Sequence, residues 1–104
     1  MKLITLSALA AAGMMLSAPT LADQTLAKKS GCTNCHAANM KIVGPSFQDI
    51  AKKYAGDAGA EAKLDDKVKK GGSGAWGAVP MPANGQVKDE DIKTLVKWIL
   101  AGAK

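Results

Sequence analysis

The sequence predicts an all-α domain of about four helices. Three observations carry this expectation. In the C-terminal segment apolar residues recur every three or four positions, which is the spacing of one helix face. Three earlier segments begin with polar capping residues or end at glycine, as helices do. No segment alternates apolar and polar residues as a half-buried strand would, so we expect no sheet.

The first three expected helices can be placed in chain order. Residues 23–30 have helical composition, and Gly31 follows them as a stop signal. A second, short helix begins at a serine cap and covers residues 46–55. The third covers residues 60–70 and ends at the glycine pair Gly71–Gly72.

The C-terminal part is expected to hold a long loop and the last helix. Residues 71–86 contain four glycines in their first seven positions and two prolines further on, which predicts a loop. Three acidic residues, 89–91, favour a helix start because they complement its positive end. The apolar stripe of that helix consists of Ile92, Leu95, Val96, Ile99 and Leu100.

The first 22 residues are predicted to be a cleaved signal peptide rather than part of the domain. Lys2 precedes an apolar run over residues 3–16, and residues 17–22 then break the run and end in the small residue Ala22, after which cleavage is expected. An uncleaved membrane anchor is the alternative, but a run of about 14 residues is short for the ~20 that span a bilayer. We therefore expect an exported domain of residues 23–104.

This domain is small and poor in large side chains. A domain of its 82 residues usually needs a disulfide, a metal or a cofactor for stability. We therefore expect a cofactor to fill part of the core. The only aromatic residues are Phe47, Tyr54, Trp76 and Trp98.

The charge of the domain comes from lysine alone. Thirteen lysines oppose nine acidic residues in residues 23–104, a net charge of +4, and the sequence has no arginine. Nucleic-acid-binding proteins favour arginine forks and aromatic stacking platforms, so we expect no nucleic-acid partner. The charge instead favours solubility and attraction to acidic surfaces on partner proteins.

The central motif is Cys32-Thr33-Asn34-Cys35-His36, a C-x-x-C-H sequence typical of c-type haem attachment. Each thiol adds to one vinyl group of the haem, and the adjacent histidine then ligates the iron. A dithiol redox motif would follow a strand, and none is expected before Cys32. A structural zinc site usually needs four ligands, and a plain disulfide would leave His36 without a role. We predict one covalent haem, bound through Cys32 and Cys35, with His36 on its iron.

A second axial ligand must be another residue type, because His36 is the only histidine. Met40 lies four residues further on and cannot readily reach the opposite side of the haem. Met81 lies between Pro80 and Pro82, which stiffen the backbone around it. We therefore expect Met81 to be the sixth ligand. The alternative is a loop methionine that fills a gap in a small core.

Three further residues are candidates for the haem surroundings. A carbonyl group near Pro45 would accept the second ring N–H of His36, or the proline merely turns the chain. Trp76 either donates its indole N–H to a haem propionate or covers the edge of the core. Asn84 either donates to the sulfur of Met81 or is an ordinary turn residue.

Together these residues resemble the class I cytochromes c, in particular the short bacterial cytochrome c-551/c-552 type. The resemblance covers residues 23–104. Besides the C-x-x-C-H motif, it depends on Val43-Gly44-Pro45, on Gly71-Gly72-Ser73-Gly74-Ala75-Trp76-Gly77, on Val79-Pro80-Met81-Pro82 and on Lys97-Trp98-Ile99-Leu100.

The resemblance implies a four-helix fold around one haem c, with His36 and Met81 as axial ligands of low-spin iron. It also implies a monomeric periplasmic carrier that passes electrons between respiratory redox proteins. Two positions depart from the family pattern. Ala83 replaces a common proline, so the Met81 loop is expected to be looser. Lys88 replaces a serine that usually caps the last helix, which leaves Asp89 as a substitute cap.

Two axial ligands would favour electron transfer over catalysis. Histidine–methionine ligation leaves no open iron position, whereas a peroxidase or gas-binding protein needs one and no second histidine is present. We therefore expect no small-molecule substrate. A haem subunit of a larger oxidase or reductase is the other alternative, although a separate signal peptide favours a free carrier. The pairs Lys28–Lys29 and Lys52–Lys53 are either docking sites for redox proteins with acidic surfaces or merely solvated faces.

Overall fold

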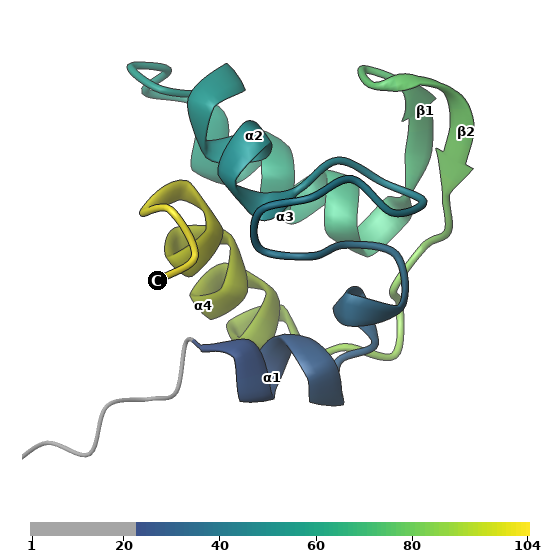
Figure 1. Cartoon of the computed structure of the whole chain (residues 1–104). Coiled ribbons are helices and arrows are strands. Elements are labelled where there is room, and N and C mark those ends of the chain that lie inside the picture. Colours follow the sequence, from purple (N-terminus) through teal and green to yellow (C-terminus); the bar gives the residue numbers. More distant parts are fainter. Residues whose placement is uncertain (1–22) are drawn as a thin grey trace, which may run out of the picture.

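The computed structural model describes residues 23–104, so the expected signal peptide lies outside the described residues. The four expected helices are present, and the order of elements is α1 (Gln24–Lys29), the 3-10 helix η1 (Cys32–Asn34), α2 (Phe47–Lys53), α3 (Ala60–Lys70), β1 (Gly72–Gly74), β2 (Gly77–Met81) and α4 (Asp89–Leu100) (Figure 1). None of these helices is long and apolar enough to cross a membrane.

Side-chain caps start the first two helices. The Asp23 carboxylate accepts a hydrogen bond from the Leu26 amide at 3.1 Å, at the N-terminus of α1. The Ser46 hydroxyl accepts one from the Asp49 amide at 3.0 Å, at the N-terminus of α2. Each cap satisfies a backbone N–H that has no partner within the helix.

The start of α4 differs from the expected cap. Lys88 occupies the cap position and makes no side-chain hydrogen bond there, so the expectation that Asp89 caps this helix is wrong. Asp89 lies in the first turn instead, and its Oδ1 pairs with Lys69 Nζ at 2.8 Å. Because Lys69 belongs to α3, this ion pair joins the start of α4 to the end of α3.

The expected loop over residues 71–86 contains a short antiparallel hairpin, so the expectation that the domain holds no sheet is wrong. β1 pairs with β2, with Gly72 opposite Met81 and Gly74 opposite Gly77. No alternating pattern revealed the strands because residues 72–80 are exposed, so neither face had to be apolar. Met81 is the last residue of β2.

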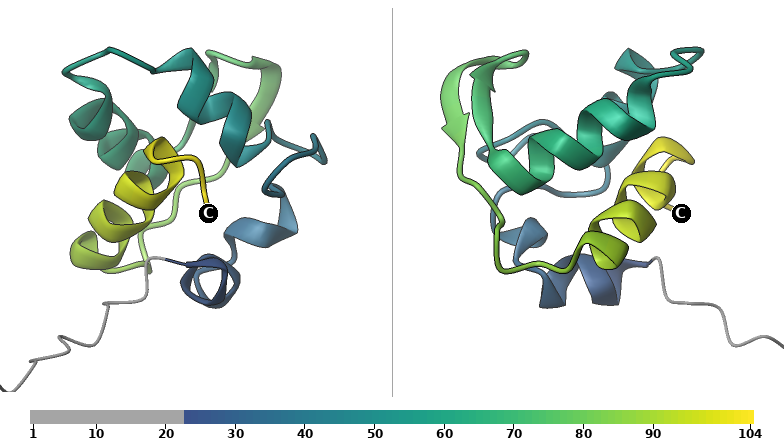
Figure 2. Two further views of the ribbon diagram at one scale, coloured as in Figure 1. Left: turned by 60° about the vertical axis from the view of Figure 1, so that its left-hand side comes forward. Right: turned by 180° about the vertical axis from the view of Figure 1, so that it is seen from behind.

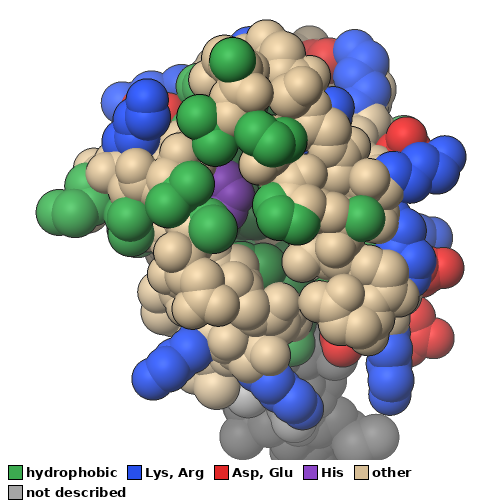
Figure 3. Space-filling view, turned by 90° about the vertical axis from the view of Figure 1, so that its right-hand side faces the viewer, with side chains coloured by type: hydrophobic (Ala, Val, Ile, Leu, Met, Phe, Trp, Pro, Cys, Tyr) green, Lys and Arg blue, Asp and Glu red, His purple; other side chains and the backbone are tan. Residues whose placement is uncertain are grey.

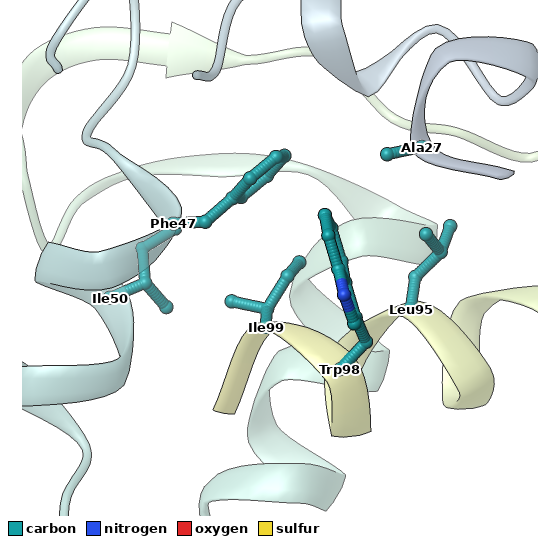
Figure 4. Close-up of a cluster of buried hydrophobic side chains, with 6 residues drawn as sticks. All are labelled: Ala27, Phe47, Ile50, Leu95, Trp98 and Ile99. Carbon is teal, nitrogen blue, oxygen red and sulfur yellow. The ribbon is translucent and has the colours of Figure 1, made fainter. Parts of the chain in front are cut away.

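The main core lies between α1, α2 and α4. The rings of Phe47 and Trp98 meet edge to face with their centroids 5.4 Å apart, a favourable aromatic geometry. Figure 4 shows these two rings pointing toward one another. The buried members of the cluster are Ala27, Phe47, Ile50, Leu95, Trp98 and Ile99.

α4 is the central helix, because it contacts each of the other three α-helices. Figure 2 shows it beside α3 and above α1 when the molecule is seen from behind. A second buried cluster of Val87, Ile92 and Val96 packs against Leu64 and Val68 of α3. The expected apolar stripe of this helix is therefore confirmed, and it serves both clusters.

Candidate haem-binding site

A cavity of about 600 Å³ lies between the helices and the hairpin. Figure 3 shows the face on which it opens, with the histidine at the bottom of a hollow and hydrophobic side chains around it. The structure brings together in its lining all seven residues that the sequence singled out: Cys32, Cys35, His36, Pro45, Trp76, Met81 and Asn84.

The two cysteines come from a tight turn that follows α1. Gly31 has φ of 84°, a left-handed conformation that favours glycine, and it turns the chain into η1. The Cys32 carbonyl then accepts hydrogen bonds from the Cys35 amide at 3.2 Å and the His36 amide at 3.0 Å. Both cysteines are free thiols and partly buried. Burial raises the pKa of the Cys32 thiol, so this group is neutral at physiological pH.

The His36 ring is buried, and one of its nitrogens has a fixed role. Nδ1 lies 2.7 Å from the Pro45 carbonyl oxygen. A carbonyl can only accept, so Nδ1 carries a proton, and in the neutral ring Nε2 is then the nitrogen whose lone pair can bind a metal. The ring also stacks on Phe47, with centroids 5.5 Å apart and planes 26° from parallel. The acceptor expected near Pro45 is thus the carbonyl of Pro45 itself.

Gly44 has a role that sequence reasoning missed. A Cβ atom at this position would lie 2.5 Å from Cε1 and 2.9 Å from Nδ1 of His36, closer than real contacts permit. The Gly44 amide also donates to the Cys35 carbonyl at 2.8 Å, which holds the segment against the haem motif. Sequence reasoning predicted only a turn at Gly44, because the close approach of its backbone to the His36 ring depends on how the loop folds.

Gly71 plays a similar part for Met81. It ends α3 with φ of 74°, and a Cβ here would lie 2.5 Å from the Met81 carbonyl oxygen and 2.7 Å from the Ala83 nitrogen. Only glycine lets the end of α3 approach this backbone so closely. The sequence identified Gly71 as a helix stop, and its contact with the Met81 segment adds a second reason for glycine.

Asn84 also holds the backbone segment that follows Met81. Its Nδ2 donates to the Val68 carbonyl at 3.1 Å and to the Pro82 carbonyl at 3.2 Å. Its backbone amide donates to Val68 as well, at 3.1 Å. The side chain lines the cavity, but these hydrogen bonds go to backbone carbonyls and tie the chain after Met81 to α3.

Trp76 lies in the turn of the hairpin, with 43% of its surface exposed. Lys53 Nζ lies 4.6 Å from the centre of its ring and donates to the Ala75 carbonyl at 2.7 Å. Sequence reasoning left Lys53 either as half of a docking pair or as part of a solvated face. No local signal could reveal this contact, because it joins residues 22 positions apart.

Large apolar side chains are exposed around the mouth of the cavity. Val43 and Val79 line it and are 52% and 66% exposed. Exposed apolar groups that cluster on one face of a small protein mark a contact surface. The large exposed hydrophobic residues of the described chain are Met40, Ile42, Val43, Trp76 and Val79.

The donor set of the cavity fits one haem c. Two thiols separated by two residues are available for covalent attachment, and a buried imidazole whose Nδ1 is bonded to a carbonyl leaves Nε2 as the metal-binding nitrogen. Met81 adds a thioether, a soft ligand that haem iron accepts. The apolar part of the lining suits a flat aromatic macrocycle.

Comparisons with known proteins agree with this arrangement. The family model described as cytochrome c matches residues 22–103. The chain is 54% identical over 87 residues to cytochrome c-551 of Allochromatium vinosum, which covers 84% of this chain and 93% of that protein. It is 45% identical over 103 residues to cytochrome c-551 of Pseudomonas aeruginosa, with 97% and 98% covered.

A solved structure shows the same fold. The crystal structure of wild-type Nitrosomonas europaea cytochrome c552 matches with a TM-score of 0.75 and 49% identity, over 77% of this chain and 99% of that one. The small helical fold with its two-stranded hairpin is therefore that of a class I cytochrome c. The chain belongs to the cytochrome c family, and it is an electron-transfer protein with covalently bound haem c rather than an enzyme.

Proposed function

We propose that this chain is a periplasmic carrier of single electrons in which His36 and Met81 are the two axial ligands of the iron. Cys32 and Cys35 hold the one haem covalently. The observation that carries the proposal is that Cys32, Cys35, His36 and Met81 line one cavity, with the Nδ1 of His36 already bonded to the Pro45 carbonyl. His36 and Met81 reach this cavity from elements 45 residues apart in the sequence.

The chain's own residues would keep both ligands in place. The haem iron, when bound, supplies a one-electron couple whose ferrous state the thioether favours. The Pro45 carbonyl fixes the tautomer of His36, and the stacked ring of Phe47 fixes its plane. Gly71 packs against the backbone of Met81 and the residues after it, and Asn84 donates to the Pro82 carbonyl, so both hold this segment in place. Ligands held in this way change little between redox states, which suits fast electron transfer.

The exposed apolar side chains around the cavity mouth support a contact surface for redox partners. Electron carriers need brief encounters, so such a contact is small and is steered by charge. Lys28 and Lys29 are exposed in α1, which leads into Ser30 and Gly31 at the edge of the cavity. In residues 23–104 neither lysine forms an ion pair, so both are available to attract acidic partner surfaces.

Replacement of Met81 by alanine tests the ligand assignment. The variant should bind cyanide in its ferric form and carbon monoxide in its ferrous form much faster than the parent. Its reduction potential should fall, because water favours ferric iron more than a thioether does. Met40→Ala is the matched control, since Met40 is 61% exposed and does not line the cavity. Sulfur-to-iron charge-transfer absorption retained in Met81→Ala, or lost in Met40→Ala, would show that Met81 is not the ligand.

Cell fractionation tests the location. The holoprotein recovered from the periplasm should begin at Asp23 and should keep its haem after extraction with acidified acetone. Retention of residues 1–22 in a membrane fraction would instead support the anchor alternative. Loss of the haem to the solvent would contradict attachment through Cys32 and Cys35.

A further inference from the structure

The hairpin is an exposed arm with functional residues at both of its ends. Residues 72–80 are exposed, and Figures 1 and 2 show the hairpin at the edge of the molecule, apart from α4. Its turn carries Trp76 and its base carries Met81, and both residues line the cavity. An exposed two-stranded hairpin is only marginally stable by itself, so its position depends on contacts with the helices.

The base of the hairpin is well anchored. Gly71 packs against the Met81 backbone, and Asn84 ties the chain that follows to α3. The turn, in contrast, depends on Lys53. Within residues 23–104, the bond from Lys53 Nζ to the Ala75 carbonyl is the one hydrogen bond that joins residues 72–80 to another element.

Lys53 is suited to this task by its place in the fold. It is the last residue of α2, a helix anchored in the core by the buried side chains of Phe47 and Ile50. From this fixed point its ammonium group makes two contacts with the turn. It donates to the Ala75 carbonyl at 2.7 Å, and it lies 4.6 Å from the centre of the Trp76 ring, within cation–π range.

We propose that Lys53 is a positioning residue for electron transfer. Its ammonium group fixes the turn of the hairpin to α2, and it thereby holds Trp76 and the strand that leads to Met81 against the haem cavity. The inference rests on the proposed function, because it takes Met81 to be the sixth ligand. It also separates Lys53 from Lys52, whose ammonium group forms no hydrogen bond to the hairpin and no ion pair within residues 23–104.

Three variants of the holoprotein test this role. Lys53→Met keeps the aliphatic stem but removes both contacts, since each needs the positive charge. Lys53→Arg keeps a cation that can donate to a carbonyl and lie over an indole ring. Lys52→Met is the matched control, because it removes the same charge from the neighbouring exposed position of α2.

Two measurements are needed, and only one depends on the sixth ligand. Amide hydrogen exchange over residues 72–81 reports opening of the hairpin. The rate of cyanide binding to the ferric protein reports how often the sixth position is vacated. We expect both to rise about tenfold in Lys53→Met, as loss of an exposed cation–π contact and a charged hydrogen bond implies. Both should stay at the parent value in Lys53→Arg and Lys52→Met.

The results separate this inference from the ligand assignment. Exchange that is unchanged in Lys53→Met overturns the inference, and so does an equal rise in Lys52→Met. Faster exchange with an unchanged cyanide rate overturns it as well, because Lys53 then holds only the turn. If Met81→Ala shows that Met81 is not the ligand, the proposed function fails, whereas the exchange measurement still decides whether Lys53 fixes the hairpin.

Discussion

Three neighbours of His36 in the sequence, Gly44, Pro45 and Phe47, define the state and position of the imidazole ring that we propose ligates the iron. The Pro45 carbonyl holds the proton on Nδ1, Phe47 stacks on the ring, and Gly44 leaves room for it. Each neighbour constrains a different property: the tautomer, the plane and the position of the ring. A substitution at any one of them should therefore change the haem environment without removing a ligand.

Gly44→Ala tests the position of the ring. The new methyl group would lie 2.5 Å from Cε1 of His36, so the ring or the loop must move. Overpacking of this kind costs about 1–3 kcal/mol in the free energy of unfolding. We expect chemical denaturation of the holoprotein to show this loss, together with a shifted reduction potential.

Gly85→Ala is the control for the same change in residue type. A Cβ at Gly85 has no atom within 4 Å, and the backbone there is not left-handed. It should leave both the potential and the free energy of unfolding near the parent values. Equal behaviour of the two variants would show that the close approach of Gly44 to His36 is not required.

At the scale of elements, the contact between α3 and α4 contains one unfavourable group. Asp65 Oδ1 is buried and has no hydrogen-bond partner within residues 23–104, although the residue as a whole is partly exposed. Burial raises the pKa of the Asp65 carboxyl, and the charge of Glu61 adds to the effect, while Lys93 and Lys97 oppose it. The folded protein therefore binds a proton at Asp65 more readily than the unfolded chain does.

The pH dependence of the protein's stability follows from this raised pKa of Asp65. Because the folded pKa exceeds the unfolded one, this group lowers stability as pH rises from the ordinary carboxyl range through the raised value. Asp65→Asn should thus unfold with a higher free energy at pH 7, by up to about 0.5 kcal/mol given partial solvent screening. The gain should shrink as the pH is lowered toward 4. Denaturant titrations at both pH values measure it.

Asp66→Asn makes the same charge change one residue further on. Asp66 is exposed and pairs with Lys70 at 2.8 Å, an exposed ion pair that contributes little. This variant should gain no stability at pH 7. A gain as large as that of Asp65→Asn would trace the effect to net charge rather than to the buried oxygen.

The elements also show which parts of the fold were predictable. The four α-helices could be predicted because each has a cap, a stop signal or a periodic apolar stripe in or next to its own residues. The haem motif and the His36–Pro45 bond are local as well. The hairpin was missed because an exposed strand needs no alternation, and the contact from Lys53 to Trp76 was missed because it forms only when two distant segments fold together.

At the scale of the whole molecule, charge and apolar surface are arranged around one opening. Three of the exposed large apolar residues, Val43, Trp76 and Val79, line the cavity, and Figure 3 shows lysines spread around the outer parts of the face on which it opens. This arrangement separates two parts of an encounter. In the encounter that we propose, the lysines would attract an acidic partner over a distance, and the apolar rim would then make the close contact.

Electron transfer to small inorganic oxidants tests the steering without knowledge of the partner. With an anionic oxidant the rate should fall as ionic strength rises from about 0.01 M to 0.15 M, because the Debye length shortens from ~30 Å to ~8 Å. With a cationic oxidant the rate should rise over the same range. Replacement of Lys28 and Lys29 by glutamate should slow the anionic oxidant several-fold at low salt and leave the haem spectrum unchanged.

A second variant with two lysines replaced by glutamate distinguishes the effect of charge near the cavity from the effect of net charge. Lys63 and Lys70 lie on α3 and do not line the cavity, so their replacement by glutamate changes the net charge equally but at a different place. Lys53 is left out of both pairs because its ammonium group contacts the hairpin. If the α1 lysines steer the encounter, their reversal slows the anionic oxidant more than the α3 reversal does. Equal slowing by the two reversals would mean that net charge alone controls the rate. Rates that change neither with salt nor with charge reversal would mean that the apolar rim alone determines the contact.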